Sequence, residues 1–297
     1  MNKENILSKI SKMSDKELLC LARNTSDVEI LNILSVNANY EVRCTVAENK
    51  NTPVELLAVL AKDINLGVRA SVAWNNNTPV ETLVMLASDK DCWVRCKVAN
   101  NKNTPAKVLA ILAKDEERWV RKGVAYNENT PDKLLFVLAK DKDIDVCYAV
   151  AKNKNTPVEL LAVLAQDEDY WVRWAVAENR STPTDVLAVL AKDDVYEVRT
   201  AVAVNGNTSV DVLVMLATDE DYHVREAVAE NKNTPANILT MLAQDKDADV
   251  RYEVTKNPHT PYNTLIMLTK DKNVLISETA EEALKECKEK GKIRIER

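Results

Sequence analysis

The stretch TPVELLAVLAKDINLGVRASVAWNNN, residues 52–77, decides the fold because its pattern returns every 26 residues along most of the chain. Thr208-Ser209 replaces Thr-Pro in one copy, and Ser26-Asp27 precedes the series as a degraded copy. An Asn, an Asp and a Val-Arg pair keep the same spacing, with Val146-Cys147 as the one break in the Val-Arg series. The Thr-Pro pairs begin at residues 52, 78, 104, 130, 156, 182, 234 and 260. About nine units without an insertion indicate a repeat protein.

Each unit begins with a predicted first helix. Thr52 is expected to cap this helix, with Pro53 at its first position and Glu55 completing a capping box. Leu57, Leu60 and other apolar residues then recur at helical spacing and predict a buried stripe, which ends at Ala61.

A short acidic link leads to a predicted second helix. In the third copy Asp91 caps it, and Val94, Val98 and Ala99 form its buried side. The helix is expected to end near Asn101, because asparagine tolerates the left-handed conformation that stops a helix.

Two short helices cannot bury their apolar stripes alone, so neighbouring units must stack. The predicted fold is all-α: a superhelical solenoid of about nine to ten two-helix repeats with N- and C-terminal capping helices. We expect a helical cap over residues 1–23, with Ser14 and Glu17 as a capping box, and repeats over residues 24–276. Residues 277–297 are expected to form a capping helix and a charged tail.

Composition sets broad limits on function. The net charge of −6 and the pI near 5.3 give no general attraction for nucleic acid or anionic membranes. No apolar run is long enough for a signal peptide or a membrane span, so a cytoplasmic location is expected. The six cysteines form no CxxC pair and are interpreted as reduced thiols.

The unit N-x-N-T-P-x-x-L-L-x-x-L-A-x-D-x-x-x-x-V-R-x-x-V-A resembles the variant leucine-rich repeat family and, more distantly, HEAT repeats. The resemblance covers roughly residues 24–276 and implies an all-helical right-handed superhelix. Some members of the family carry an N-terminal cysteine cluster that binds iron–sulfur. Only Cys20 precedes the repeats here, so that property does not transfer, and no cofactor is expected.

The repeated polar residues are interpreted as structural. Each Asp is expected to accept hydrogen bonds from backbone or from an Arg of its own or the next unit, and each Asn to satisfy loop backbone groups. The segment DKDID (141–145) lacks the Gly and Glu that a calcium loop needs, at Val146 and Lys152. No metal site and no catalytic constellation is predicted, so the chain is not expected to be an enzyme.

Function is expected at the positions that vary. Counting from the Val of the second helix as position 0, positions −1, +2, +3 and +6 face away from the buried side. All five tryptophans fall on these positions, with charged residues and tyrosines among them. The predicted partner-binding residues are Trp74, Trp93, Lys97, Trp119, Lys122, Tyr126, Asp145, Tyr148, Trp171 and Trp174.

The leading hypothesis is a non-enzymatic scaffold that binds a protein or peptide in an aromatic-rich concave groove, with acidic ends that select basic residues. The rings could instead pack against one another between units and leave little surface for binding. Nucleic-acid binding is the alternative, although the four variable positions sum to about −5 over the nine units. A third alternative is a glycosylase-like enzyme that uses Asp145 between Trp119 and Trp171.

Overall fold

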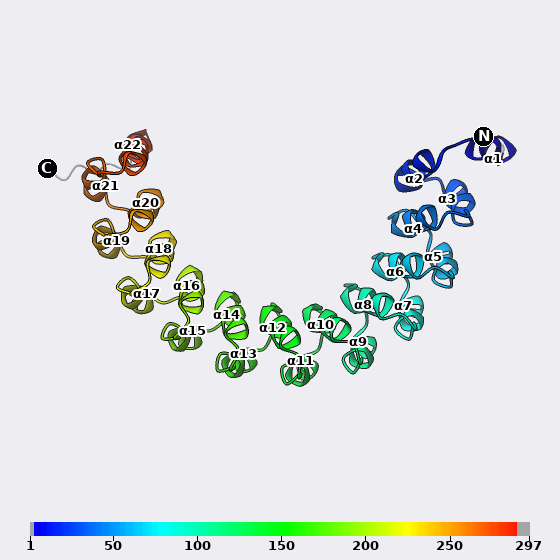
Figure 1. The fold of residues 1–297 in the computed structure, drawn as a ribbon, viewed down its shortest axis with the longest axis horizontal. Coiled ribbons are helices and arrows are strands. Elements are labelled where there is room, and N and C mark those ends of the chain that lie inside the picture. Colours follow the sequence, from blue (N-terminus) through cyan, green and yellow to red (C-terminus); the bar gives the residue numbers. More distant parts are fainter. Residues whose placement is uncertain (1–2, 290–297) are drawn as a thin grey trace. The chain divides into compact units, whose positions relative to one another are not determined.

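A computed structural model describes residues 3–289, with side chains described over 7–287. All regular elements in this part of the chain are α-helices (Figure 1). They belong to two compact units, residues 1–155 and residues 156–297. The helices of the first unit are α1 (Lys3–Ile10), α2 (Asp15–Asn24), α3 (Val28–Leu34), α4 (Tyr40–Glu48), α5 (Val54–Leu60), α6 (Leu66–Trp74), α7 (Val80–Leu86), α8 (Cys92–Asn100), α9 (Ala106–Leu112), α10 (Arg118–Tyr126), α11 (Asp132–Leu138) and α12 (Ile144–Lys152).

The second unit repeats the same alternation of seven-residue and nine-residue helices and ends in a longer one. Its helices are α13 (Val158–Leu164), α14 (Tyr170–Glu178), α15 (Thr184–Leu190), α16 (Tyr196–Val204), α17 (Val210–Leu216), α18 (Tyr222–Glu230), α19 (Ala236–Leu242), α20 (Ala248–Lys256), α21 (Tyr262–Leu268) and α22 (Val274–Glu289).

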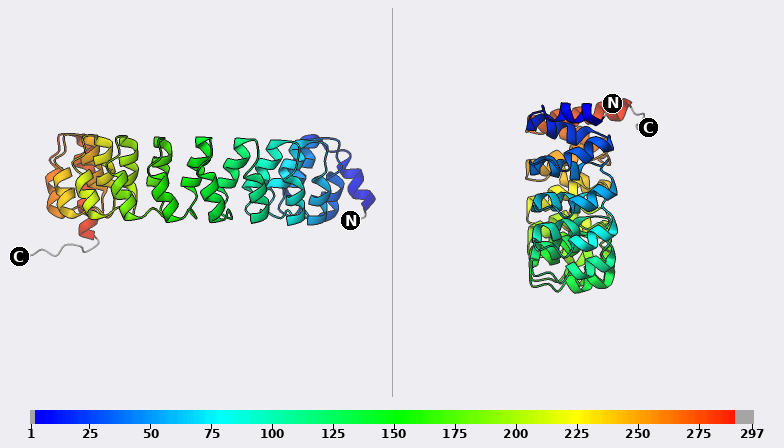
Figure 2. Two further views of the ribbon diagram at one scale, coloured as in Figure 1. Left: turned by 90° about the horizontal axis from the view of Figure 1, so that it is seen from below. Right: turned by 90° about the vertical axis from the view of Figure 1, so that its right-hand side faces the viewer.

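Within each unit the helices form two rows (Figures 1 and 2). The even-numbered second helices pack directly on one another, whereas each first helix packs mainly against the second helices beside it. Figure 1 shows the even-numbered row on the inner side of the curve in each unit, and we call it the inner row. The predicted all-helical solenoid of two-helix repeats is therefore confirmed.

The predicted core is also confirmed. Leu57, Leu60 and Ala61 of the first-helix stripe are buried, as are Val94 and Val98 of the second helix. Fully burying an aliphatic side chain of this size contributes about 1.5–3 kcal/mol to folding, and every repeat brings an equivalent set. The repeated apolar positions thus carry most of the stacking.

The predicted capping by Thr52 is wrong. The first helix is capped by Pro53, which makes no side-chain cap hydrogen bond. The buried hydroxyl of Thr52 instead donates to the carbonyl of Val46, at 2.5 Å, in the last turn of the preceding helix α4. The threonine therefore satisfies the end of one helix rather than the start of the next, because its Oγ1 points back across the loop.

The reason given for the helix end at Asn101 is also wrong. Its φ of −74° and ψ of 124° are extended, not left-handed. The buried side-chain amide donates to the carbonyls of Ala73, at 2.8 Å, and Asn75, at 3.0 Å, in the preceding repeat, and its oxygen accepts from the N–H of Asn103. The expected role of the asparagines in satisfying loop backbone is confirmed.

The Asp and Arg series form the expected ladder. Arg69 makes a two-pronged ion pair with Asp89 of the next repeat, at 2.6 and 3.0 Å, and also donates to the carbonyls of Asp63 and Ile64, at 2.9 and 3.0 Å. Burial alone would raise the pKa of the Asp89 carboxyl, but the hydrogen bonds from Arg69 and from the Asp91 N–H outweigh it and lower that pKa. Planar paired contacts of this kind fix geometry as well as charge.

The ends of the chain differ from the repeats. Ser14 and Glu17 form the predicted capping box at the start of α2. α2 also takes the place of a second helix, because it packs against α4 and its Ala22 carbonyl accepts from Asn49. α22 already begins at Val274, and the predicted tail beyond residue 289 lies outside the described residues. The division into caps over 1–23 and 277–297 remains a prediction.

Candidate protein-binding surface

The exposed face of the inner row carries the tryptophans. Trp74, Trp93, Trp119 and Trp171 are about half exposed, at 54%, 53%, 49% and 51%. Trp174 is half-buried. Tryptophan is a large, mostly apolar side chain, so four tryptophans that each expose about half of their surface are unusual. Exposed tryptophans of this kind commonly anchor binding partners.

Position +3 does not belong to this exposed face in most repeats, which corrects the helical-wheel expectation. Small side chains occupy it and are buried where successive second helices meet, among them Thr45, Gly123, Ala149, Ala175 and Ala201. A Cβ on Gly123 would lie 2.5 Å from Nδ2 of Asn100 on the neighbouring helix α8. The helices approach too closely there for a larger residue, so the exposed face consists mainly of positions −1, +2 and +6.

In the first unit a lysine lies between two of the tryptophans. Nζ of Lys97 is 4.8 Å from the ring centroid of Trp74 and 4.3 Å from that of Trp93. The contacts join two successive second helices, since Trp74 ends α6 and the other two residues belong to α8. The cation–π contacts hold both rings in place while leaving their outer faces open.

The next tryptophan is flanked by two cations. The guanidinium of Arg118 lies 4.5 Å, and Nζ of Lys122 5.3 Å, from the ring centroid of Trp119. Lys122 also makes a 3.0 Å ion pair with Asp145 on α12, and Arg118 is 3.9 Å from the same carboxyl. Asp145 is therefore neutralised by the chain's own cations, which does not favour the enzymatic alternative that needs this carboxylate for a ligand.

Two tyrosines continue the same face. Burial raises the pKa of Tyr126 to about 12, with further contributions from Tyr148 and Asp145. The phenol of Tyr126 therefore remains neutral at physiological pH. We call Trp74, Trp93, Lys97, Trp119, Lys122 and Tyr126 the aromatic strip, a continuous set on helices α6, α8 and α10 of the first unit.

In the second unit the aromatic residues of α14 form a cluster of their own. Trp171 and Trp174 meet edge to face, with ring centroids 5.9 Å apart and an interplanar angle of 82°. Tyr170 lies 4.9 Å from Trp171. These contacts join rings of one helix, whereas Tyr196 and His223 stack between neighbouring second helices, as the packing alternative expected. Trp171 keeps half of its surface exposed.

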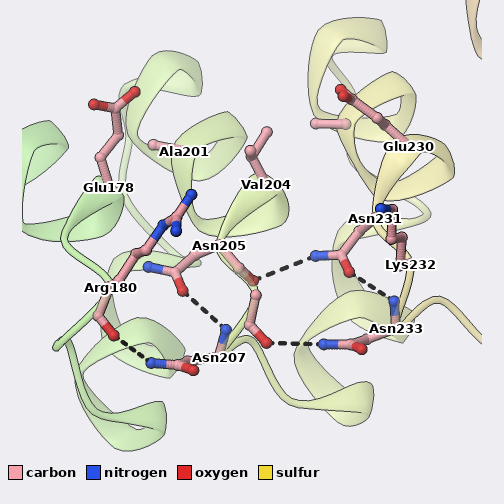
Figure 3. Close-up of a pocket in the computed structure, with 12 residues that line it drawn as sticks. Glu178, Arg180, Ala201, Val204, Asn205, Asn207, Glu230, Asn231, Lys232 and Asn233 are labelled. Atoms are coloured by element: carbon pink, nitrogen blue, oxygen red, sulfur yellow. Dashed lines mark hydrogen bonds between the residues drawn. The ribbon is translucent and has the colours of Figure 1, made fainter.

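A cavity of about 820 Å³ lies farther along the inner row of the second unit (Figure 3). It arises at the seventh repeat, where Val204 and Gly206 replace the longer side chains of both neighbours. Those neighbours contribute Glu178 and Arg180 on one side and Glu230 and Lys232 on the other. The loop asparagines at its floor are already hydrogen-bonded, for example Asn207 to the Arg180 carbonyl and Asn233 to the Gly206 carbonyl.

Sequence reasoning missed this cavity, although its signal was present. Gly206 is the one glycine among the variable loop positions, and a Cβ there would meet nothing within 4 Å. Comparing the repeats at two positions together, the loop position of Gly206 and the second-helix position +6 of Val204, would have shown that both long side chains are replaced in the same repeat.

Sequence reasoning also missed an exposed apolar row on the first helices. One residue per repeat, just before the last leucine of the helix, is well exposed: Val59, Met85, Ile111, Val137, Val163, Val189, Met215, Met241 and Met267. Because this row recurs in every repeat, it lacks the local variation that marks the aromatic strip. It is nevertheless a second surface that binding experiments must distinguish from the inner row.

Within residues 7–287 no group of three or more His, Cys, Asp or Glu side chains is arranged to hold a metal ion. All six cysteines are free thiols, and burial raises the pKa of Cys44 and Cys96. None of the helices described over residues 3–289 combines the length and apolar character needed to cross a membrane.

The repeat geometry agrees with a known family. The model of the leucine-rich repeat variant family matches residues 40–63 and 222–247, each of which runs from a second helix into the following repeat or link. In these two segments the chain is similar to variant leucine-rich repeats. The resemblance predicted from the Thr-Pro, Asp and Val-Arg spacing is therefore confirmed.

The chain is also similar to several solved structures. A protein described as a leucine-rich repeat variant with a novel repetitive structural motif is 29% identical, with a TM-score of 0.55, over 74% of this chain and 86% of that one. An engineered protein is 19% identical over 97% of this chain and 99% of its own, with a TM-score of 0.34. Importin beta is 12% identical over 96% of this chain and 48% of its own, with a TM-score of 0.36. No curated protein sequence matches the chain.

The chain thus forms a helical repeat solenoid, a fold typical of protein-interaction scaffolds.

Proposed function

We propose that the chain is a non-enzymatic cytoplasmic scaffold that binds a protein or peptide along the inner row of its second helices. The half-exposed tryptophans carry this proposal, because large rings held by neighbouring cations present area at low entropic cost. The proposed contact residues are the aromatic strip with Asp145 and Tyr148 in the first unit, and Trp171 and Trp174 in the second.

Nucleic-acid binding has less support. Lysines interleaved with tryptophans could accompany stacked bases, but Lys97 lies against two rings and Lys122 is paired with Asp145. Cations engaged in this way release few counterions from a phosphate backbone.

The test uses peptides selected from a random library on the full-length chain, with affinities measured by fluorescence anisotropy. The variant Trp93→Ala/Trp119→Ala removes two anchors of the aromatic strip and is expected to weaken binding by at least about tenfold, equivalent to about 1.4 kcal/mol. The matched control Phe136→Ala/Val137→Ala removes exposed apolar side chains from the first helix α11.

The two variants separate the surfaces. Loss of binding in the control but not in the tryptophan variant would assign recognition to the apolar row of the first helices and refute the proposal. Circular dichroism should show unchanged helical content in both variants. A pull-down from cell lysate with and without nuclease would expose a nucleic-acid partner, since such partners would disappear on nuclease treatment.

A further inference from the structure

The inner row brings two particular positions together in each pair of neighbouring repeats. Position +2 of one second helix meets position −1 of the next. Sγ of Cys96 lies 3.5 Å from the Trp119 carbonyl, and Nζ of Lys122 lies 3.0 Å from Oδ1 of Asp145. Because the repeats have equal length, this register predicts which side chains meet elsewhere in the row.

In the second unit the same two positions are both acidic. Glu226 on α18 stands where Lys122 stands on α10, and Asp249 on α20 stands where Asp145 stands on α12. α18 and α20 are packed neighbours, as α10 and α12 are. The ion pair of the first unit is thus replaced by two carboxylates, and the site lacks the cation that the first unit supplies from its own chain.

The surroundings do not compensate for this charge. Burial raises the pKa of Glu226, and the nearby carboxylates of Asp249 and Glu253, with Asp247, raise it further, while His223 acts in the opposite direction. The arginines of α18 and α20 turn away to their own ladder partners. Lys256, at the end of α20, is bound to Glu253 at 2.7 Å.

Aromatic rings lie on the same two helices as the acidic pair. The ring of His223 stacks on Tyr196 at 5.4 Å and contacts Tyr222 at 3.9 Å. The ammonium of Lys256 lies 5.1 Å from the centroid of Tyr252, next to its carboxylate partner. The chain itself therefore shows, on this face, a cation held between a ring and a carboxylate.

The cavity of Figure 3 lies against the same helix α18. Ala227 and Glu230 line it and follow Glu226 by one and four residues, although Glu226 and Asp249 are not part of its lining. Residues four apart on a helix lie on the same side, so the wall of the cavity at Glu230 is about one helical turn from Glu226. A partner chain that occupies the cavity would therefore lie close to the acidic pair.

We infer that the Glu226–Asp249 pair binds an arginine side chain of the partner protein, in the place that Lys122 fills in the first unit. The planar guanidinium matches both features of the site, since it pairs with carboxylates through several donors and stacks on flat rings. This inference rests on the proposed function, that the inner row binds a protein, and adds the chemistry that the partner must present at α18 and α20.

The test uses two probes on the full-length chain: a fluorescein-labelled peptide of alternating alanine and arginine, and its analogue with citrulline, which keeps the shape and loses the charge. Anisotropy titrations should show the arginine peptide binding at least about tenfold more tightly than the citrulline peptide. Equal affinities would overturn the inference.

The variant Glu226→Lys restores the type of pair formed by Lys122 and Asp145. It should weaken binding of the arginine peptide by about tenfold or more, and its thermal midpoint should not fall, because a repulsive contact becomes attractive. The control Glu220→Lys makes the same change of charge just before Asp221, the N-cap of α18, at a side chain that is 94% exposed. It should change affinity by less than about threefold, since long-range charge is screened.

If both lysine variants lost the same affinity for the arginine peptide, the peptide would be attracted only by the net charge of the chain. That result would overturn the inferred site at Glu226 and Asp249. Trp93→Ala/Trp119→Ala should leave the arginine peptide bound, because the aromatic strip lies in the other unit. Failure of the library peptides to depend on these tryptophans would therefore count against the proposed function, whereas failure of the arginine probe would count against this site.

Discussion

Replacing Arg69 by leucine should show how much one rung of the Arg–Asp ladder contributes. The guanidinium makes four hydrogen bonds of 2.6 to 3.0 Å, two of them to Asp89, and each side chain of the pair is only 9% exposed. Removing one member of a buried pair costs about 3–5 kcal/mol, because the other charge stays buried without its partner. Leucine keeps the apolar packing of the stem, and the Asp91 N–H still donates to Asp89, so we expect about 3 kcal/mol.

Arg118→Leu is the matched control. It makes the same chemical change at an arginine that is 49% exposed and lies 3.4 Å from Asp143. Exposed pairs contribute about 0–1 kcal/mol. Urea unfolding followed by circular dichroism gives the overall change. Because repeat arrays do not always unfold in one step, amide hydrogen exchange in α6 and α8 should give the local change in stability. A loss below about 1 kcal/mol for Arg69→Leu, equal to the control, would refute the role assigned to the ladder.

Three further predictions concern the repeat itself. Asn101→Gly should destabilise the chain by about 2 kcal/mol or more in urea unfolding, because two buried carbonyls lose their donor; a stabilising effect would instead indicate a left-handed residue there. Gly123→Ala should cost about 1–3 kcal/mol through its contact with Asn100, whereas Gly206→Ala should be neutral or slightly stabilising, as thermal melts of the two variants would show. Acid titration followed by circular dichroism should show stability lost as the pH falls below about 4: the ladder aspartates have lowered pKa values when folded, so their contribution is full above the unfolded pKa and disappears as they protonate. Unchanged stability down to about pH 2 would contradict this.

The fold followed from the sequence because the same residues recur at the same offsets. Periodicity identified the buried leucines and valines, the Arg–Asp pairing and the structural role of the asparagines. The detailed hydrogen bonds did not follow, because they depend on direction. Thr52 could have turned its hydroxyl forward to the next helix or back to Val46, and its spacing allows both.

The candidate site was predictable only in part. A helical wheel places position +3 on the open side, but in most repeats the neighbouring second helix covers it and a small residue such as Gly123 or Ala149 occupies it. The tryptophans were correctly placed on the inner row because the wheel fixes their side of the helix. The contacts of Lys97 with Trp74 and of Lys122 with Asp145 join neighbouring repeats, so they needed the spacing between repeats, which one repeat's sequence does not contain.

The Arg–Asp ladder and the series of asparagine hydrogen bonds run in opposite directions along the chain. The two sides of a junction between repeats therefore carry different groups. Arg225 reaches forward to Asp245, while Asn257 donates backward to the carbonyl of Ala229. A chain severed in the loop between α18 and α19 would leave a guanidinium on one fragment and a matching carboxylate and amide on the other. The fragments could rejoin only head to tail and in one register. Apart from the junction where Cys147 replaces the arginine, the junctions use the same three groups, so whole repeats can be added or deleted during evolution without a new kind of contact.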